Sequence, residues 1–147
     1  MVRILAIDFG ERRIGLAISD PLGITAQGLP TMDTKKVEDI FSHIQEIIKD
    51  KKVTKVVVGM PKNMNGSIGF KGKEVGRFID KLNQKTGVEV VAWDERLTSV
   101  QSQKSMREMG TKQKKKEMVD KISATLILQS YLDSLSKGDK DFLPDGI

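Results

Sequence analysis

The chain contains no cysteine and one histidine. The absence of cysteine excludes disulfides, thiolate metal sites and cysteine nucleophiles, and it agrees with a reducing compartment, so we expect a cytoplasmic protein. The histidine, His43, falls in phase with Lys36 and Asp50 on the polar side of a predicted helix, where a solvated surface residue is expected rather than a catalytic one. Carboxylates and basic side chains are the groups left to carry chemistry.

Long apolar runs are also missing. No segment approaches the roughly 20 residues that cross a bilayer, and the short apolar N-terminus contains Asp8 and lacks a small-residue cleavage site. We therefore expect neither a membrane span nor a signal peptide. The 147 residues, 38% hydrophobic and 31% charged, suit one ordinary globular domain. We expect this domain over residues 1–136, followed by a polar tail at 137–147.

The positive charge is unevenly distributed. The net charge is +5, and Arg96 to Lys121 holds 8 Lys or Arg against 3 Asp or Glu, which leaves 17 of each sign in the rest of the chain. The whole excess therefore lies in one segment that contains Lys112, Lys114, Lys115 and Lys116. A local basic patch on an otherwise neutral chain indicates a polyanion partner, although a solvated helix end would have the same composition.

Hydrophobic periodicity predicts alternating strands and helices. Apolar runs predict strands at Val2–Ile7, Ile14–Ser19, Val56–Val58 and Val88–Trp93, with a weaker edge strand at Thr25–Thr31. Helical spacing predicts helices over Val37–Ile48, with Asp33 or Thr34 as N-cap, over Val75–Leu82 before Gly87, over Val100–Met109, and over Met118–Leu135. This order predicts an α/β fold with a mixed five-stranded sheet, a three-strand meander plus two parallel strands, flanked by helices.

Carboxylates follow two of these strands. Asp8 ends the first one, and Asp94 and Glu95 end the last one. Strands joined by helical crossovers run parallel, so these residues should meet at one edge of the sheet, where α/β proteins bind ligands. Asp120 is in phase with Ala124, Ile127 and Tyr131 on the apolar stripe of the final helix, which points it toward the sheet.

Three converging carboxylates predict a divalent cation site. Buried carboxylates are costly unless paired or metal-bound, and oxygen-only ligation favours Mg²⁺ or Mn²⁺. Two such ions, roughly 4 Å apart, stabilise the attacking and leaving oxygens of a phosphoryl displacement. Glu11 and Asp20 lie further from the strand ends and are weaker candidates. Taken singly, Asp8 could be a turn residue after a strand and Asp120 a helix N-terminal charge.

A glycine-rich segment, Gly59–Gly72, separates a predicted strand from a predicted helix. Its glycines permit close backbone approach to a phosphate, and Lys62, Lys71 and Lys73 supply positive charge. The spacing differs from that of a P-loop, and Glu74 stands where Ser or Thr would bind Mg²⁺. A surface loop without a ligand is the alternative.

These segments together resemble the YqgF family, also called RuvX, of Holliday-junction resolvases that are also proposed as nucleases for the 5′ end of pre-16S ribosomal RNA. The resemblance covers nearly the whole chain in order, through Asp8–Gly10, Arg13–Ala17, Asp20, Gly59–Pro61, Asn63–Gly66, Asp94–Thr98, Asp120 and Ile127–Asp133. It implies a ribonuclease H-like fold and metal-dependent cleavage, with Asp8, Glu95 and Asp120 as the catalytic, metal-binding set. Met60 and Ser123 depart mildly from the family pattern.

Three functions remain open at this stage. The leading hypothesis is a metal-dependent nuclease that processes the 5′ end of pre-16S rRNA. The second is a resolvase of branched DNA, which would need a dimer with two active sites, and the third is a non-catalytic RNA-binding or transcription-associated factor. The chain could be a monomer or a homodimer. The basic residues expected to contact nucleic acid, with one amide, are Arg13, Lys62, Asn63, Arg96, Lys112, Lys114, Lys115 and Lys116.

Overall fold

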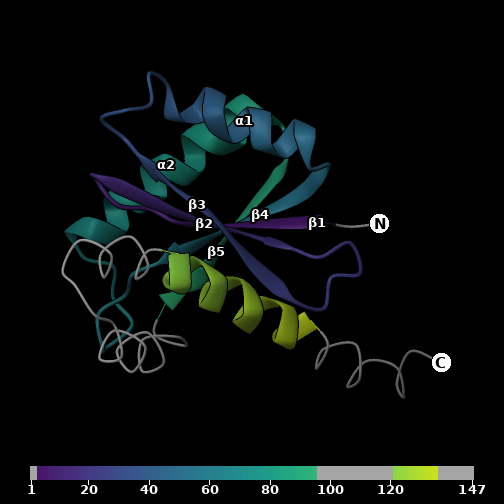
Figure 1. Ribbon diagram of the computed structural model, residues 1–147. Helices are drawn as coiled ribbons and strands as arrows, with labels where there is room; N and C mark the ends of the chain where they lie inside the picture. The colour runs from purple at the N-terminus through teal and green to yellow at the C-terminus, as the bar shows by residue number, and fades with distance from the viewer. Residues whose placement is uncertain (1–2, 96–120, 136–147) are drawn as a thin grey trace, which may run out of the picture.

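A mixed five-stranded sheet forms the centre of the computed structural model, which describes residues 3–95 and 121–135 (Figure 1). Strands β1 (Arg3–Asp8), β2 (Arg13–Ser19) and β3 (Ala26–Asp33) form an antiparallel meander. Strands β4 (Val53–Met60) and β5 (Glu89–Asp94) run parallel to β1, and the spatial order is β3-β2-β1-β4-β5. The predicted meander and parallel pair are confirmed, with β3 at an edge.

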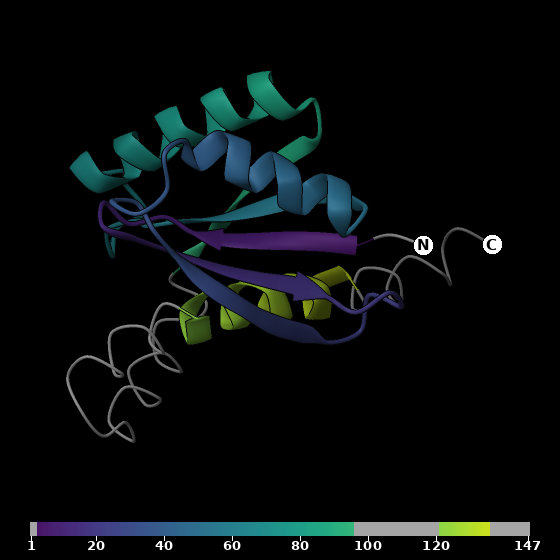
Figure 2. The same cartoon turned by 45° about the horizontal axis from the view of Figure 1, so that its top comes forward.

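Helices cover both faces of this sheet. Helices α1 (Ile40–Asp50) and α2 (Phe70–Thr86) lie together on one face. Residues 121–135 are helical and lie on the opposite face, and we call them the C-terminal helix (Figures 1 and 2). The parallel strands are joined through α1 and α2, as crossover connections between parallel strands require.

Two hydrophobic cores result from this layering. Side chains alternate along β1, so that Leu5 and Ile7 pack toward α1 and α2 while Ile4 and Ala6 pack toward the C-terminal helix. Because both faces are covered, β1 and β4 are continuous apolar runs rather than alternating ones. The C-terminal helix contributes its buried stripe to the second core through Ala124, Ile127, Leu128, Tyr131 and Leu132.

The start of α1 differs from the prediction. Asp39 is the N-cap, and its carboxylate accepts a hydrogen bond of 3.0 Å from the Phe41 backbone N–H. Neither Asp33 nor Thr34 caps the helix, because the helix begins only at Ile40; Asp33 ends β3, where its carboxylate accepts from the Lys35 backbone N–H and pairs with Arg12 at 3.0 Å. The prediction was wrong here because residues 34–36 form a separate turn after β3, and the helix begins at Ile40 rather than at Val37.

Other boundaries agree more closely. Gly87 ends α2 in the left-handed conformation with φ of 69°, as predicted for a C-cap glycine. Strand β4 is longer than predicted and includes Gly59, which pairs with Trp93 of β5. The predicted helix at Val100–Met109 and the polar tail lie outside the described residues. Among the described helices, none is long and apolar enough to cross a membrane.

We expect Ser19→Ala to destabilise the fold. The buried Ser19 hydroxyl accepts a hydrogen bond of 2.8 Å from the Ile4 backbone N–H, near the start of β1. The substitution leaves this buried N–H without its acceptor, which costs about 1–3 kcal/mol of unfolding free energy, measurable by urea denaturation. Ser134→Ala is the matched control, because the Ser134 hydroxyl only donates to the Tyr131 carbonyl within its own helix. A loss no larger for Ser19→Ala than for Ser134→Ala would contradict this role.

Candidate functional site

Two of the predicted carboxylates lie at the same edge of the sheet. Asp8 is the last residue of β1, and Glu95 directly follows β5. Both strands are parallel to β4, which lies between them. The carboxyl ends of the three strands therefore share one edge, and both carboxylates are half-buried there.

The two side chains also share one face of the sheet. Ala6 and Trp93 pack in the core beneath the C-terminal helix. Asp8 and Glu95 follow these two residues at a spacing of two, so the pleat directs them to the same side. Asp94 alternates to the opposite face, although it is the neighbour of Glu95 in sequence.

Gly59 provides the space between these strands. A Cβ atom at this position would stand 2.7 Å from Oε1 of Glu95 and 2.6 Å from Cδ1 of Ile127. The Glu95 carboxylate therefore lies across β4, above the Gly59 backbone and beside the C-terminal helix. Any larger residue would occupy the volume that Glu95 and Ile127 now fill.

This arrangement brings the carboxylates near each other. Neighbouring strands are about 4.8 Å apart, so β1 and β5 are separated by roughly 10 Å across β4. Because the Glu95 carboxylate extends over β4, it lies roughly one strand spacing from β1, where Asp8 ends. Two carboxylates at such a distance repel each other, and a divalent cation between them would remove that repulsion.

The third predicted carboxylate, Asp120, lies outside the described residues. The residues in phase with it on the C-terminal helix have the expected orientation, since Ala124, Ile127 and Tyr131 are all buried against the sheet. Within residues 3–95 and 121–135 no group of three potential ligands is close enough to hold a metal ion. Of the three predicted ligands, Asp8 and Glu95 are the two that the described part of the chain places at one edge of the sheet.

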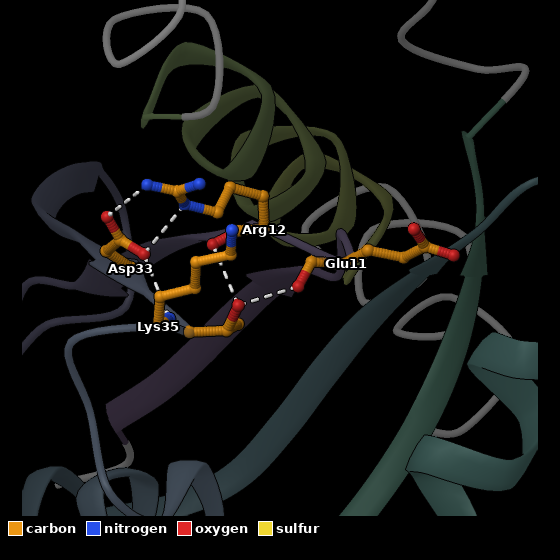
Figure 3. A network of polar contacts seen from close by, with 5 residues as sticks. Glu11, Arg12, Asp33 and Lys35 are labelled. Atoms are coloured by element: carbon orange, nitrogen blue, oxygen red, sulfur yellow. Dashed lines mark hydrogen bonds and ion pairs between the residues drawn. The ribbon is translucent and has the colours of Figure 1, made fainter.

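The weaker acidic candidates are placed differently. Asp20 lies in the β2–β3 turn at the opposite end of the sheet, where its carboxylate accepts hydrogen bonds of 2.7 and 2.9 Å from the backbones of Ile24 and Thr25. These backbone hydrogen bonds hold the pKa of Asp20 below its usual value, and the bond from Thr25 has the largest effect. The Glu11 carboxylate is exposed and points away from the Arg12–Asp33 ion pair (Figure 3).

The glycine-rich loop leaves β4 between the two carboxylate-bearing strands. Its turn is closed by backbone hydrogen bonds from Asn63 to Ser67 and from Gly66 to Asn63, of 2.9 and 2.8 Å. The Asn63 side chain donates to the Ser67 hydroxyl at 2.9 Å, and Gly66 adopts a φ of 86°. The exposed Lys62 begins this loop, so one predicted cation and one predicted amide lie beside the carboxylate edge.

The remaining predicted basic residues divide into two groups. Arg13 begins β2 and is half-buried at the far side of β1 from β4. The other five, Arg96, Lys112, Lys114, Lys115 and Lys116, lie outside the described residues. Sequence reasoning missed the role of Gly59, although a glycine inside a strand pattern is a known sign of close approach by another group.

Comparison with known proteins gives consistent matches over most of the chain. A family model described as RuvX, Holliday junction resolvase, matches residues 2–134. A protein of Acetivibrio thermocellus named "Putative pre-16S rRNA nuclease" is 49% identical over 139 residues, which cover 92% of this chain and 99% of that protein. A Clostridium tetani protein of the same name is 47% identical and covers 91% of this chain and 98% of its own length.

Solved structures show the same fold at low sequence identity. The chain is similar to Thermus thermophilus RuvC in complex with a Holliday junction substrate, with a TM-score of 0.54 and 14% identity over 86% of this chain and 92% of that one. It is also similar to the fowlpox virus Holliday junction resolvase, with a TM-score of 0.51 and 14% identity over 91% and 99% of the two chains. These likenesses identify the predicted ribonuclease H-like fold.

We expect Gly59→Ala to lower the unfolding free energy by about 1–3 kcal/mol, the usual cost of overpacking, because the new methyl group would displace Glu95 or Ile127. Gly76→Ala is the control, since a Cβ at Gly76 meets nothing within 4 Å, and it should raise stability by about 0.5–1 kcal/mol in the interior of α2. Ile127→Val should recover part of the loss in the double variant. Equal stability of Gly59→Ala and the wild type in denaturant unfolding would contradict the close approach.

Proposed function

Because the chain belongs to the RuvX family of nucleases, we propose that it cleaves a phosphodiester of structured RNA during maturation of the 5′ end of pre-16S rRNA. In this proposal Asp8 and Glu95 are ligands of a divalent cation. The observation that carries the proposal is the position of the Glu95 carboxylate over Gly59, on the same face and edge of the sheet as Asp8. A cytoplasmic location would follow from this substrate.

The donor set fits Mg²⁺ or Mn²⁺. Both described ligands offer oxygen atoms alone, which these cations prefer, and neither a cysteine nor a histidine is near them in sequence. We propose Asp120, one residue before the described part of the C-terminal helix, as the third ligand on its sequence pattern. When bound, such a cation would stabilise the charge on the phosphoryl oxygens and favour deprotonation of an attacking water molecule.

The chain's own residues have three tasks in this proposal. Asp8 and Glu95 hold the cation from two strands of a rigid sheet, which keeps their separation fixed. Gly59 leaves the space that lets Glu95 reach across β4. Lys62 and Asn63, in the hydrogen-bonded loop after β4, can bind the phosphate backbone beside the cut bond.

Arg96 and the lysine run at 112–116 extend the proposal to substrate binding. A guanidinium next to Glu95 in sequence is suited to bidentate contact with a phosphate. The lysines concentrate the excess positive charge just before Asp120 in sequence. Such backbone contacts supply affinity without base specificity.

We expect Asp8→Asn and Glu95→Gln each to reduce cleavage of a precursor 16S rRNA fragment by at least ~100-fold. Loss of a group that merely supports a metal ligand lowers metal affinity or activity by about 10–100-fold, so loss of a ligand itself should lower the cleavage rate by at least the upper end of that range. RNA binding should remain, because the positive residues are unchanged. The measurement is single-turnover cleavage with Mg²⁺ or Mn²⁺, and removal of the metal by EDTA should abolish the wild-type rate.

Asp20→Asn is the matched control, since the Asp20 carboxylate lies at the other end of the sheet. It should cleave at the wild-type rate if the protein is folded. Equal cleavage by wild type and Asp8→Asn would rule out the proposed site. Full rescue of a deletion strain by Asp8→Asn would instead favour the non-catalytic RNA-binding or transcription-associated role.

A DNA junction resolvase is the second candidate, and it is favoured by the description of the matching family. Symmetric cleavage of a four-way junction needs two active sites, hence a dimer. Sedimentation with a synthetic four-way junction tests this candidate. If this chain resolves junctions, two copies should sediment on each junction, and a strict monomer in the presence of the junction would count against this candidate.

A further inference from the structure

A positively charged cavity lies at the β3 edge of the sheet, apart from the two carboxylates. Its volume is about 560 Å³, and it is lined by basic side chains from four parts of the fold. Arg13 comes from the start of β2, Lys36 from the turn after β3, His43 from α1 and Lys121 from the C-terminal helix. Pro30, Thr31 and Met32 of β3 form its floor.

Within the described ranges, Asp33 is the acidic residue of this cavity, and its carboxylate attracts Lys36 without forming an ion pair with it. Within residues 3–95 and 121–135, the side chains of Arg13, Lys36 and Lys121 form neither an ion pair nor a hydrogen bond. The cavity's acidic residue, Asp33, already accepts hydrogen bonds of 3.0 Å from the Arg12 guanidinium and from the Lys35 backbone N–H (Figure 3). The cavity therefore keeps a net positive charge.

Packing holds one of these cations in place. The aliphatic part of Lys121 lies against Gly28 of β3, where a Cβ atom would stand 2.5 Å from Cγ and 2.8 Å from Cδ of the lysine. A lysine stem that lies along the protein surface leaves its ammonium group in water, where it can meet an anion. The backbone of Lys36 is held by a hydrogen bond of 3.0 Å to the Asp33 carbonyl. The two lysines thus approach the cavity from opposite faces of the sheet.

The register relates this cavity to Asp8. Asp8 pairs with Gly15 of β2, and the neighbours of Gly15 pair with Leu29 and Met32, so Gly15 faces the bulge at Pro30 and Thr31. Two strand spacings of about 4.8 Å place the cavity floor roughly 10 Å from Asp8. One strand of a duplex carries a phosphate for about every 3.4 Å of axis and also winds around that axis, so a straight distance of roughly 10 Å spans about three nucleotides at most and two when the winding is included.

We propose that this cavity is a second phosphate site, which holds a backbone phosphodiester of the substrate two to three nucleotides from the bond that is cut. The inference rests on the proposed nuclease function and adds a positioning site to it. Lys36 and Lys121 supply charge, Arg13 can bind two phosphate oxygens at once, and the His43 imidazole can donate one further hydrogen bond. The site reads no base, because its groups face the backbone alone.

The test compares two charge-matched double variants in the Asp8→Asn background, so that binding is measured without cleavage. Lys36→Gln/Lys121→Gln removes two cavity charges. Lys49→Gln/Lys52→Gln removes two charges at the opposite end of the sheet, where α1 leads into β4. The dependence of log affinity on log salt for a precursor 16S rRNA fragment should flatten by about 1.4 to 1.8 for the cavity variant alone. Equal slopes for the two variants would overturn the proposal.

A scan with neutral methylphosphonates then locates the contact along the strand. Neutralising one phosphate should weaken binding to the Asp8→Asn protein at a position that no longer matters in the cavity variant. That phosphate should lie two to three nucleotides from the wild-type cleavage site. Loss of sensitivity at every position alike, or at the cleaved phosphate itself, would overturn the proposal, because it would indicate a general effect of charge.

Two further results separate this inference from other accounts. If the wild type does not cleave the RNA but the cavity variant loses one position-specific contact, the phosphate site stands and the nuclease proposal fails. Inorganic pyrophosphate serves as the free-ligand probe in calorimetry. Binding of pyrophosphate that depends on Lys36 and Lys121, together with an unchanged methylphosphonate scan, would show a site for a free anion and would overturn the substrate assignment.

Discussion

The parallel pairing of β4 with both β1 and β5 is the constraint on which the site depends. It places the ends of three strands at one edge, and the pleat then turns Asp8 and Glu95 to the same face. With a larger residue at position 59, strand pairing alone would not bring the two carboxylates near each other, since the Glu95 side chain crosses the middle strand where a Cβ would stand. Backbone hydrogen bonding and a missing methyl group together set the distance between the two carboxylates.

The same sheet relates the carboxylate edge to the basic cavity. The row through Asp8 continues across Gly15 of β2 to the bulge in β3, where the cavity begins. The C-terminal helix spans this face, with Ile127 above Gly59 and Lys121 above Gly28. One helix thus packs beside the carboxylates and also contributes a cation to the cavity, so a shift of this helix would alter both places.

Much of this organisation could be predicted from sequence because it depends on short-range patterns. Apolar runs identified every described strand and so placed Asp8 and Glu95 at strand ends. Their position at one shared edge followed from the parallel crossovers. Contacts between distant residues could not be predicted in the same way. The Arg12–Asp33 ion pair joins two segments that no local pattern relates, and the space above Gly59 is filled by Ile127, which is far from it in sequence. The cavity likewise joins Lys36 to Lys121, which no local pattern relates.

We propose that Asp8 and Glu95 hold one divalent cation between them. The most direct test is Mn²⁺ binding to the RNA-free protein, measured from the electron paramagnetic resonance signal of the free ion. We expect uptake of Mn²⁺ by the wild type and by Asp20→Asn, and an affinity for Mn²⁺ at least ~100-fold weaker for Asp8→Asn and Glu95→Gln. Equal Mn²⁺ affinity in all four proteins would contradict it.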